Sequence, residues 1–188
     1  MRGHRLALLA ALVAAAAAAA PAPARAEVVT ATDSHFVAKQ TVTIAAPPPA
    51  VWHVLTAEIG QWWSPDHTWS GDAANLTIDP RPGGCFCEKL PNGGVRHMQV
   101  VFVKSPELLR LEGGLGPLQE QSLTGMMTWK LAPAGEGCAL EVVYRVAGAV
   151  DGGLTTWAPL VDSVLGLQVV RLKGFVETGN PATGGEAK

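Results

Sequence analysis

Glu88 and His97 are the two side chains whose types and spacing best suit acid–base chemistry near neutral pH. They flank Asn92-Gly93, and Asn-Gly is the strongest short-range signal for a β-hairpin. A two-residue turn centred on this dipeptide pairs Glu88 directly with His97 on one face. Directly opposed residues lie about 5 Å apart at Cβ, so we expect the carboxylate and the imidazole to be in contact.

The chemistry of this pair depends on which face of the hairpin is buried. If Glu88 and His97 are buried, the carboxylate orients the imidazole for proton transfer. If they face solvent, they form an ordinary cross-strand ion pair worth less than about 1 kcal/mol. Both faces of residues 85–103 carry apolar side chains, so the alternation leaves both interpretations open.

Several aromatic residues precede Glu88 in the sequence, and this clustering favours a binding pocket. Residues 62–88 hold three of the six Trp and two of the three Cys. Bulky amphipathic rings near a Pro and a His commonly line a concave site, although core packing is the alternative for every Trp. A His67 bonded to a backbone carbonyl is likewise the alternative to a ligand contact. The candidate ligand-binding residues are Trp62, Trp63, His67, Trp69, Phe86, Gln99, Met127, Trp129, Trp157 and Val161.

The cysteines favour packing over chemistry. Cys85 and Cys87 are two apart on an expected strand, so both point to one face. We expect them to be small apolar thiols, because a disulfide between such neighbours would be strained. A metal site with His67 or His97 is a weaker alternative, since C-x-C alone lacks the spacing of a structural zinc site. No metal and no cofactor are therefore expected.

The N-terminus has the pattern of an export signal. A basic start precedes the apolar run 6–20, and Ala24-Arg25-Ala26 is an A-x-A cleavage pattern. We expect residues 1–26 to be a signal peptide cleaved after Ala26, and the protein to be exported to the periplasm. An uncleaved membrane anchor is the alternative, but the run is shorter than the roughly 20 residues of a membrane span. No stable membrane insertion is expected after cleavage.

Composition excludes several classes of function. The formal charge is −2 and the basic residues are scattered, which argues against nucleic-acid binding. No nucleophile motif, phosphate loop or paired-carboxylate hydrolase pattern is present. The oligomeric state is left open.

The elements that would position these residues form a mixed pattern. After a short polar lead, strands are expected at 35–45, 76–79, 85–90, 95–103, 108–111, 121–131 and 139–146. Helical spacing covers 49–59, a short turn or helix 61–63, and about 20 residues from Thr155. This order predicts an α+β fold in which an antiparallel sheet packs on one long C-terminal helix. The Gly-rich tail 178–188 is expected to be disordered.

The order and motifs resemble the SRPBCC superfamily, the START and birch-pollen-allergen-like helix-grip fold. Within it the chain is most similar to exported members near the Hsp90-ATPase-activator-like and polyketide cyclase/dehydrase groups. The similarity spans residues 36–176, which makes residues 27–177 one domain. It rests on residues 44–47 before 51–52, 59–63, 81–86, and 103–106 before 109–111.

This resemblance implies a curved sheet wrapped around the helix, with an apolar cavity between them. Two main functions then remain open, because fold alone does not fix function; a structural role, such as pairing with an envelope protein through the sheet edge, is a weaker third alternative. The first is an exported binding protein that holds a small apolar ligand, lipid- or polyketide-like. The second is a cyclase or dehydratase in which His97, oriented by Glu88, abstracts a proton while His67 or a Trp N–H polarises a carbonyl.

Overall fold

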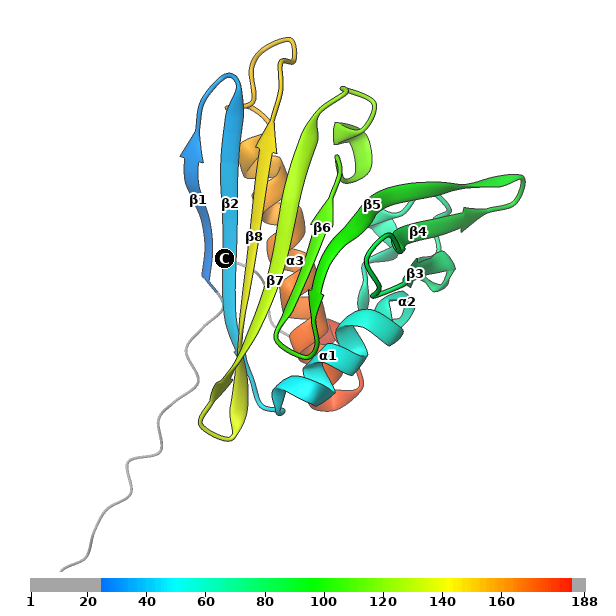
Figure 1. Ribbon diagram of the computed structural model, residues 1–188, viewed down its shortest axis with the longest axis vertical. Helices are drawn as coiled ribbons and strands as arrows, with labels where there is room; N and C mark the ends of the chain where they lie inside the picture. The colour runs from blue at the N-terminus through cyan, green and yellow to red at the C-terminus, as the bar shows by residue number, and fades with distance from the viewer. Residues whose placement is uncertain (1–24, 184–188) are drawn as a thin grey trace, which may run out of the picture.

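The computed structural model describes residues 25–183, which form one antiparallel sheet and one long helix with short helices between them (Figure 1). The eight strands follow the order β1-β2-β8-β7-β6-β5-β4-β3, and every neighbouring pair is antiparallel. The long helix α3 packs along β2, so the sheet curves around it. The predicted α+β helix-grip fold is therefore confirmed.

The elements lie close to their expected positions. The strands are β1 (Arg25–Ala31), β2 (His35–Ile44), β3 (Leu76–Ile78), β4 (Cys85–Leu90), β5 (Gly93–Lys104), β6 (Leu108–Glu112), β7 (Thr124–Ala134) and β8 (Gly137–Ala147). The helices are α1 (Pro48–Ala57), α2 (Ile59–Trp62) and α3 (Ala158–Thr178), with short 3₁₀ turns η1 (Pro65–His67), η2 (Ala73–Asn75), η3 (Gly116–Leu118) and η4 (Pro181–Thr183).

Alternation of side chains places the core between sheet and helix. In β2, Phe36, Ala38, Gln40, Val42 and Ile44 are all buried, while the residues between them are partly exposed. Burying one face of a strand fixes its register, since a one-residue slip would turn that face to solvent. The same alternation continues in β7 and β8. The three strands thus bury one face of the sheet, and α3 packs on this sheet along β2.

The prolines after β2 start α1. Pro47 is extended and precedes a helix with Pro at its first positions, where the missing N–H costs nothing. Val51 and Leu55, one turn apart, bury the inner side of the helix. Among the described residues, no helix combines the length and the apolar character that a membrane crossing requires.

Strand β1 was not expected, because residues 1–26 match a signal peptide and a short polar lead is predicted after them. It is an edge strand, paired only with β2, with a register shift between Val28 and Thr30. Edge strands need little apolar pattern, since one side faces solvent. The predicted signal segment lies outside the described residues except for Arg25 and Ala26, the first two residues of β1; residues 184–188 of the tail also lie outside them.

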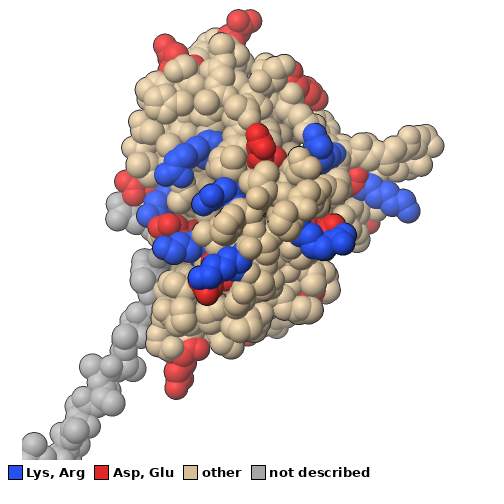
Figure 2. Space-filling view, viewed as in Figure 1, with Lys and Arg blue, Asp and Glu red and all other residues tan. Residues whose placement is uncertain are grey.

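Charge is mixed on the face of the molecule shown in Figure 2. Lys and Arg form a loose belt there, with Asp and Glu among them. Within the sheet, Lys39 and Glu141 form an ion pair, 2.6 Å apart across β2 and β8. This face does not carry the uninterrupted basic surface typical of nucleic-acid binding.

Candidate functional site

A pocket of about 350 Å³ opens beside the N-terminal half of α3. Its walls come from α3, from the segment around η1, from η3 and from strands β3, β4 and β5. The lining residues that are buried form its floor: Leu76, Phe86, His97, Leu118, Leu165 and Trp63. The lining residues that are exposed form its rim: Asp66, His67, Trp69, Pro117 and Leu160.

Hydrogen bonds to Trp63 and to Glu88 of β4 fix the segment around η1, which forms one side of the pocket. The indole N–H of Trp63 donates to the backbone oxygen of His67 at 3.0 Å. The backbone N–H groups of Trp69 and Ser70 donate to the two carboxylate oxygens of Glu88 at 3.0 and 2.5 Å. This rim is therefore tied to β4 and does not depend on apolar contacts alone.

Tyr144 holds the opposite side. Its hydroxyl accepts a hydrogen bond from the N–H of Leu115 and donates one to the oxygen of Gly113, both at 2.9 Å. Gly125 makes room for this ring, because a Cβ there would lie 2.5 Å from the Tyr144 ring. Tyr144 on β8 thus fixes the residues that lead into η3, and burial raises the pKa of its hydroxyl, which keeps it protonated.

The hairpin register differs from the predicted one. The turn lies at Pro91 and Asn92, so Leu90 pairs with Gly93 and Glu88 pairs with Val95. The register then shifts between Phe86 and Cys87, which leaves His97 as an extra residue on β5. A β-bulge of this kind re-aims a side chain, and both His97 and Met98 are buried as a result. The predicted direct pairing of Glu88 with His97 is wrong.

Glu88 and His97 nevertheless meet on one face of the hairpin. His97 Nε2 lies 2.9 Å from Glu88 Oε2, and the two residues are 4% and 2% exposed. A solvent-facing ion pair is therefore excluded. Phe86 lies against the imidazole with ring centroids 5.1 Å apart, and Trp63 against Phe86 at 5.4 Å.

The electrostatics of the pair favour an ionised carboxylate and a neutral imidazole. Burial alone would raise the pKa of Glu88, but the hydrogen bonds from Ser70, Trp69 and His97 together hold it below its ordinary value. For His97, burial outweighs the hydrogen bond and charge of Glu88 and lowers the pKa. Since a carboxylate can only accept, Nε2 of His97 carries the proton. His97 Nδ1 is then a hydrogen-bond acceptor, and it has no partner among the described residues.

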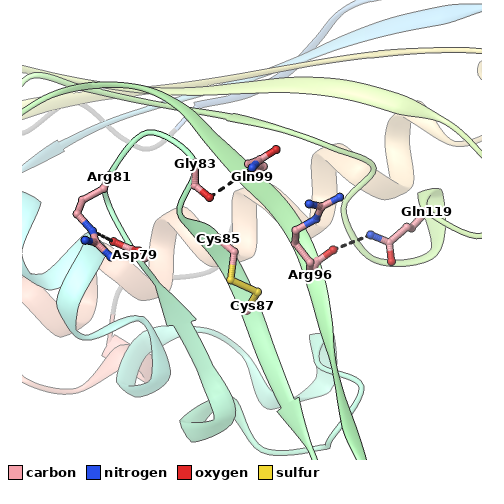
Figure 3. The surroundings of a disulfide bond; sticks show 8 residues. All are labelled: Asp79, Arg81, Gly83, Cys85, Cys87, Arg96, Gln99 and Gln119. Carbon is pink, nitrogen blue, oxygen red and sulfur yellow. Dashed lines mark hydrogen bonds and ion pairs between the residues drawn. A yellow bond between two sulfur atoms is a disulfide. The ribbon is translucent and has the colours of Figure 1, made fainter.

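Cys85 and Cys87 form a disulfide bond, so the expectation of two free thiols is wrong (Figure 3). Their Cα atoms are 5.4 Å apart, shorter than the roughly 6.6 Å of two extended residues. The register shift between Phe86 and Cys87 lies within this short segment. Cys138 is a free, buried thiol. Among the described residues, no three His, Cys, Asp or Glu side chains are grouped so that they could hold a metal.

The sequence also identifies the family. Residues 35–177 match the protein family described as "Polyketide cyclase / dehydrase and lipid transport". The chain belongs to this polyketide cyclase/dehydrase and lipid transport family. This finding and the fold together confirm the predicted SRPBCC membership. A comparison with curated proteins gives no match.

Solved structures share the fold of this family member at low sequence identity. A conserved protein of unknown function, EF2215 from Enterococcus faecalis, is 17% identical with a TM-score of 0.54, over 83% of this chain and 78% of that one. CalU16 from Micromonospora echinospora is 15% identical with a TM-score of 0.52, over 87% and 86%. Aha1 from Colwellia psychrerythraea is 14% identical with a TM-score of 0.52, over 75% and 96%.

The predicted site residues divide between pocket and core. Those that line the pocket are Trp63, His67, Trp69, Phe86, His97, Trp157 and Val161. Trp62, Met127 and Trp129 are buried in the sheet–helix core instead, and the indole of Trp62 donates to the oxygen of Val54. Gln99 pairs with Cys85, which places it on the disulfide side of β4 and β5, where it donates to Gly83 (Figure 3).

Several lining residues were not among the predicted ones. They are Asp66, Thr68, Leu76, Leu115, Gly116, Pro117, Leu118, Leu160, Val164 and Leu165. Val164 and Leu165 carried a signal, since both belong to the helical pattern of α3. The residues at η3 carried none, because a Gly-Pro turn does not reveal what it packs against.

Proposed function

We propose that this family member binds an apolar small molecule, lipid- or polyketide-like, in the pocket beside α3. The observation that carries the proposal is a pocket whose floor is aromatic and aliphatic and whose rim exposes Trp69 and Leu160, at 49% and 64%. Large exposed apolar side chains around an opening mark a binding site more often than an ordinary surface.

The pocket can supply useful affinity by desolvation. Each Å² of apolar surface removed from water contributes about 25 cal/mol. A ligand that buries roughly 300 Å² would gain about 7 kcal/mol, which is close to micromolar binding. Tryptophan walls also lose little side-chain entropy on binding, because they have two rotatable bonds.

Export remains part of the proposal. The basic start, the apolar run and the A-x-A pattern before Glu27 support a periplasmic location. Removal of residues 1–26 would take away two residues of β1 and leave residues 27–31 to pair with β2.

A second candidate function is proton transfer by the Glu88–His97 pair. The contact of 2.9 Å, the burial and the free Nδ1 support a general base in the pocket. The groups suggested for polarising a carbonyl support it less well. The indoles of Trp62 and Trp63 are bonded to backbone oxygens, and His67 is exposed at the rim. Binding without turnover is therefore the first candidate.

Filling the pocket tests the binding proposal. Val161 lines the pocket, whereas Ser163, two residues further along α3, is exposed and does not. We expect Val161→Trp to weaken binding of the neutral dye N-phenyl-1-naphthylamine more than tenfold, because the indole would occupy the dye's volume. Ser163→Trp adds the same group outside the pocket and should bind like the parent. Dye fluorescence titrations measure both, and native mass spectrometry of the parent should show a co-purified small molecule. Equal dye binding by the two variants, or none by the parent, would contradict the proposal.

A further inference from the structure

We propose that the ligand of this pocket is a neutral molecule with a hydroxyl group, such as a phenol or an enol, that donates a hydrogen bond to Nδ1 of His97. This inference rests on the proposed binding function and specifies the chemistry of what is bound. Three features of the site carry it: an unpartnered acceptor, a fixed tautomer and the charges around the pocket.

The first feature is Nδ1 of His97. The residue lines the pocket floor and is 4% exposed, but Nδ1 itself is buried and has no hydrogen-bond partner among the described residues, so a ligand reaches it only when the imidazole or a neighbouring side chain of the floor shifts. Buried polar atoms are nearly always paired, because leaving one unpaired forfeits its interaction with water. A ligand that donates a hydrogen bond to Nδ1 would remove this cost, whereas an apolar ligand would leave Nδ1 without a partner.

The second feature is that Nδ1 can only accept. Glu88 presents oxygens alone, and all of its contacts are donors: Trp69 N–H, Ser70 N–H and His97 Nε2. The proton of a neutral imidazole therefore lies on Nε2, which leaves a lone pair on Nδ1. Burial also favours the neutral ring. A ketone or an ether offers only acceptors and cannot satisfy this atom.

The third feature is the sign of the charges around the pocket. Glu88 lies directly behind the imidazole, and Asp66 is at the rim. None of the described residues that line the pocket is Lys or Arg. A bound carboxylate would lose its water without meeting a cation and would face two negative side chains, which is unfavourable in an apolar site. Fatty acids and other carboxylic acids in their ionised form are thereby disfavoured.

An ammonium group also fits poorly. It has three donors to satisfy, and Glu88 already accepts three hydrogen bonds from protein donors, which leaves about one acceptor site on the carboxylate. A hydroxyl has one donor, and Nδ1 of His97 is enough to accept it. An aromatic or conjugated hydroxyl would in addition stack on the rings that surround the imidazole, Phe86 and, beyond it, Trp63.

Three probes of one shape test the inference: 4-butylphenol, its methyl ether 4-butylanisole, and 4-butylbenzoate, each competed against the neutral dye at pH 7.5. We expect the phenol to bind about tenfold more tightly than the ether, which is the usual effect of leaving a buried acceptor unpaired. The benzoate should be weaker than the phenol by at least tenfold. His97→Phe removes the acceptor and keeps an aromatic ring, so it should bring phenol and ether to within about twofold of each other.

The outcomes separate this inference from the binding proposal. If phenol and ether compete equally in the parent, or the benzoate binds best, the inference is wrong while binding in the pocket stands. If the dye itself does not bind, the binding proposal is wrong. Should His97→Phe fail to fold, the nitrogen chemical shift of His97 Nδ1 in the parent replaces it: phenol must shift this resonance and the ether must not.

Discussion

The two halves of α3 face the same sheet but meet very different surroundings. Most of the buried residues of the helix lie from Leu165 onward, and the helix packs against β2 and the short helices α1 and α2. Before Leu165, the residues from Pro159 to Val164 are exposed or half-buried, and three of them, Leu160, Val161 and Val164, line the pocket. One helix therefore serves as core on one half and as a pocket wall on the other.

The difference follows from what lies opposite each half. Beside the second half, Arg171 donates to the backbone oxygen of Trp62 at 2.9 Å and Gln168 accepts from Ser64 N–H at 2.9 Å. These bonds draw the segment after α2 onto the helix and close the space. Toward the first half, β4 and β5 diverge from the helix (Figure 1), and side chains from loops supply the wall. Packing fills one end and leaves the other open.

The strongest test of this contrast compares two tryptophans. Trp62 is fully buried, with ring centroids 5.5 Å from Trp63 and 6.3 Å from Trp129. We expect Trp62→Ala to lower the free energy of unfolding by about 3–5 kcal/mol, because it leaves a cavity in a packed core. Urea denaturation followed by circular dichroism measures the loss.

Trp157→Ala is the matched change in the open half. Trp157 is only partly buried and lines the pocket, so we expect a loss of about 1 kcal/mol in stability, typical of an ordinary substitution, with several-fold weaker dye binding. Equal losses of stability in the two variants would show that the two halves are packed alike and would remove the contrast.

The sequence predicts the packed half better than the open half. The alternation in β2 and β7 and the helical spacing of α3 follow from burial of one face, and that requirement is local. The same logic placed Met127 and Trp129 in the pocket, but it could not distinguish a pocket wall from core. That distinction depends on how far β4 and β5 diverge from α3, which no local pattern encodes.

The contact between Glu88 and His97 shows how a site can be predicted for an incomplete reason. Asn-Gly signalled the hairpin, but the turn is one residue earlier than assumed, so Glu88 pairs with Val95; His97 lies two residues further along β5, on the same face, and stays within reach of the carboxylate. The disulfide spans the same irregularity. A register shift has no residue signature in this sequence, so neither feature could be read from it.

Acidification should lower the free energy of unfolding through His97, which lines the pocket in the open half. Its pKa is lowered by burial from the ordinary value of 6.5, so the unfolded chain binds more protons than the folded one below that value. Stability is therefore full above pH 6.5 and falls as the pH drops through the folded pKa, by at most about 1.4 kcal/mol per pH unit. The lowered pKa of Glu88 acts in the same direction below its ordinary value of 4.5.

His97→Phe isolates this contribution. Asp66 and His67, which line the same pocket, and Glu88 remain in both proteins. We expect the parent to lose more stability than the variant between pH 7.5 and 5, measured by urea denaturation at each pH. Parallel curves for the two proteins over this range would mean that His97 titrates in the folded state as it does in the unfolded one.

The smallest expected effect concerns the disulfide, which borders the pocket without lining it. Cys85 and Cys87 are partly exposed, on the face of β4 opposite Phe86 and Glu88. Their sequence separation is 2, and closing a loop of about three residues restricts the unfolded chain by only about 1.6 kcal/mol, against about 3 kcal/mol for a 15-residue loop. We expect the double variant Cys85→Ser/Cys87→Ser to lose about 1–2 kcal/mol and to bind the dye within about twofold of the parent.

Thiol labelling provides the control for this expectation. Without reductant, the folded parent should take up no iodoacetamide, because the remaining thiol of Cys138 is buried and burial raises its pKa, which keeps it in the unreactive protonated form. After reduction, mass spectrometry should show two added labels. A loss of more than about 3 kcal/mol in the double variant would exceed what so short a loop can contribute. It would mean that the disulfide also stabilises the folded state of the β4–β5 hairpin.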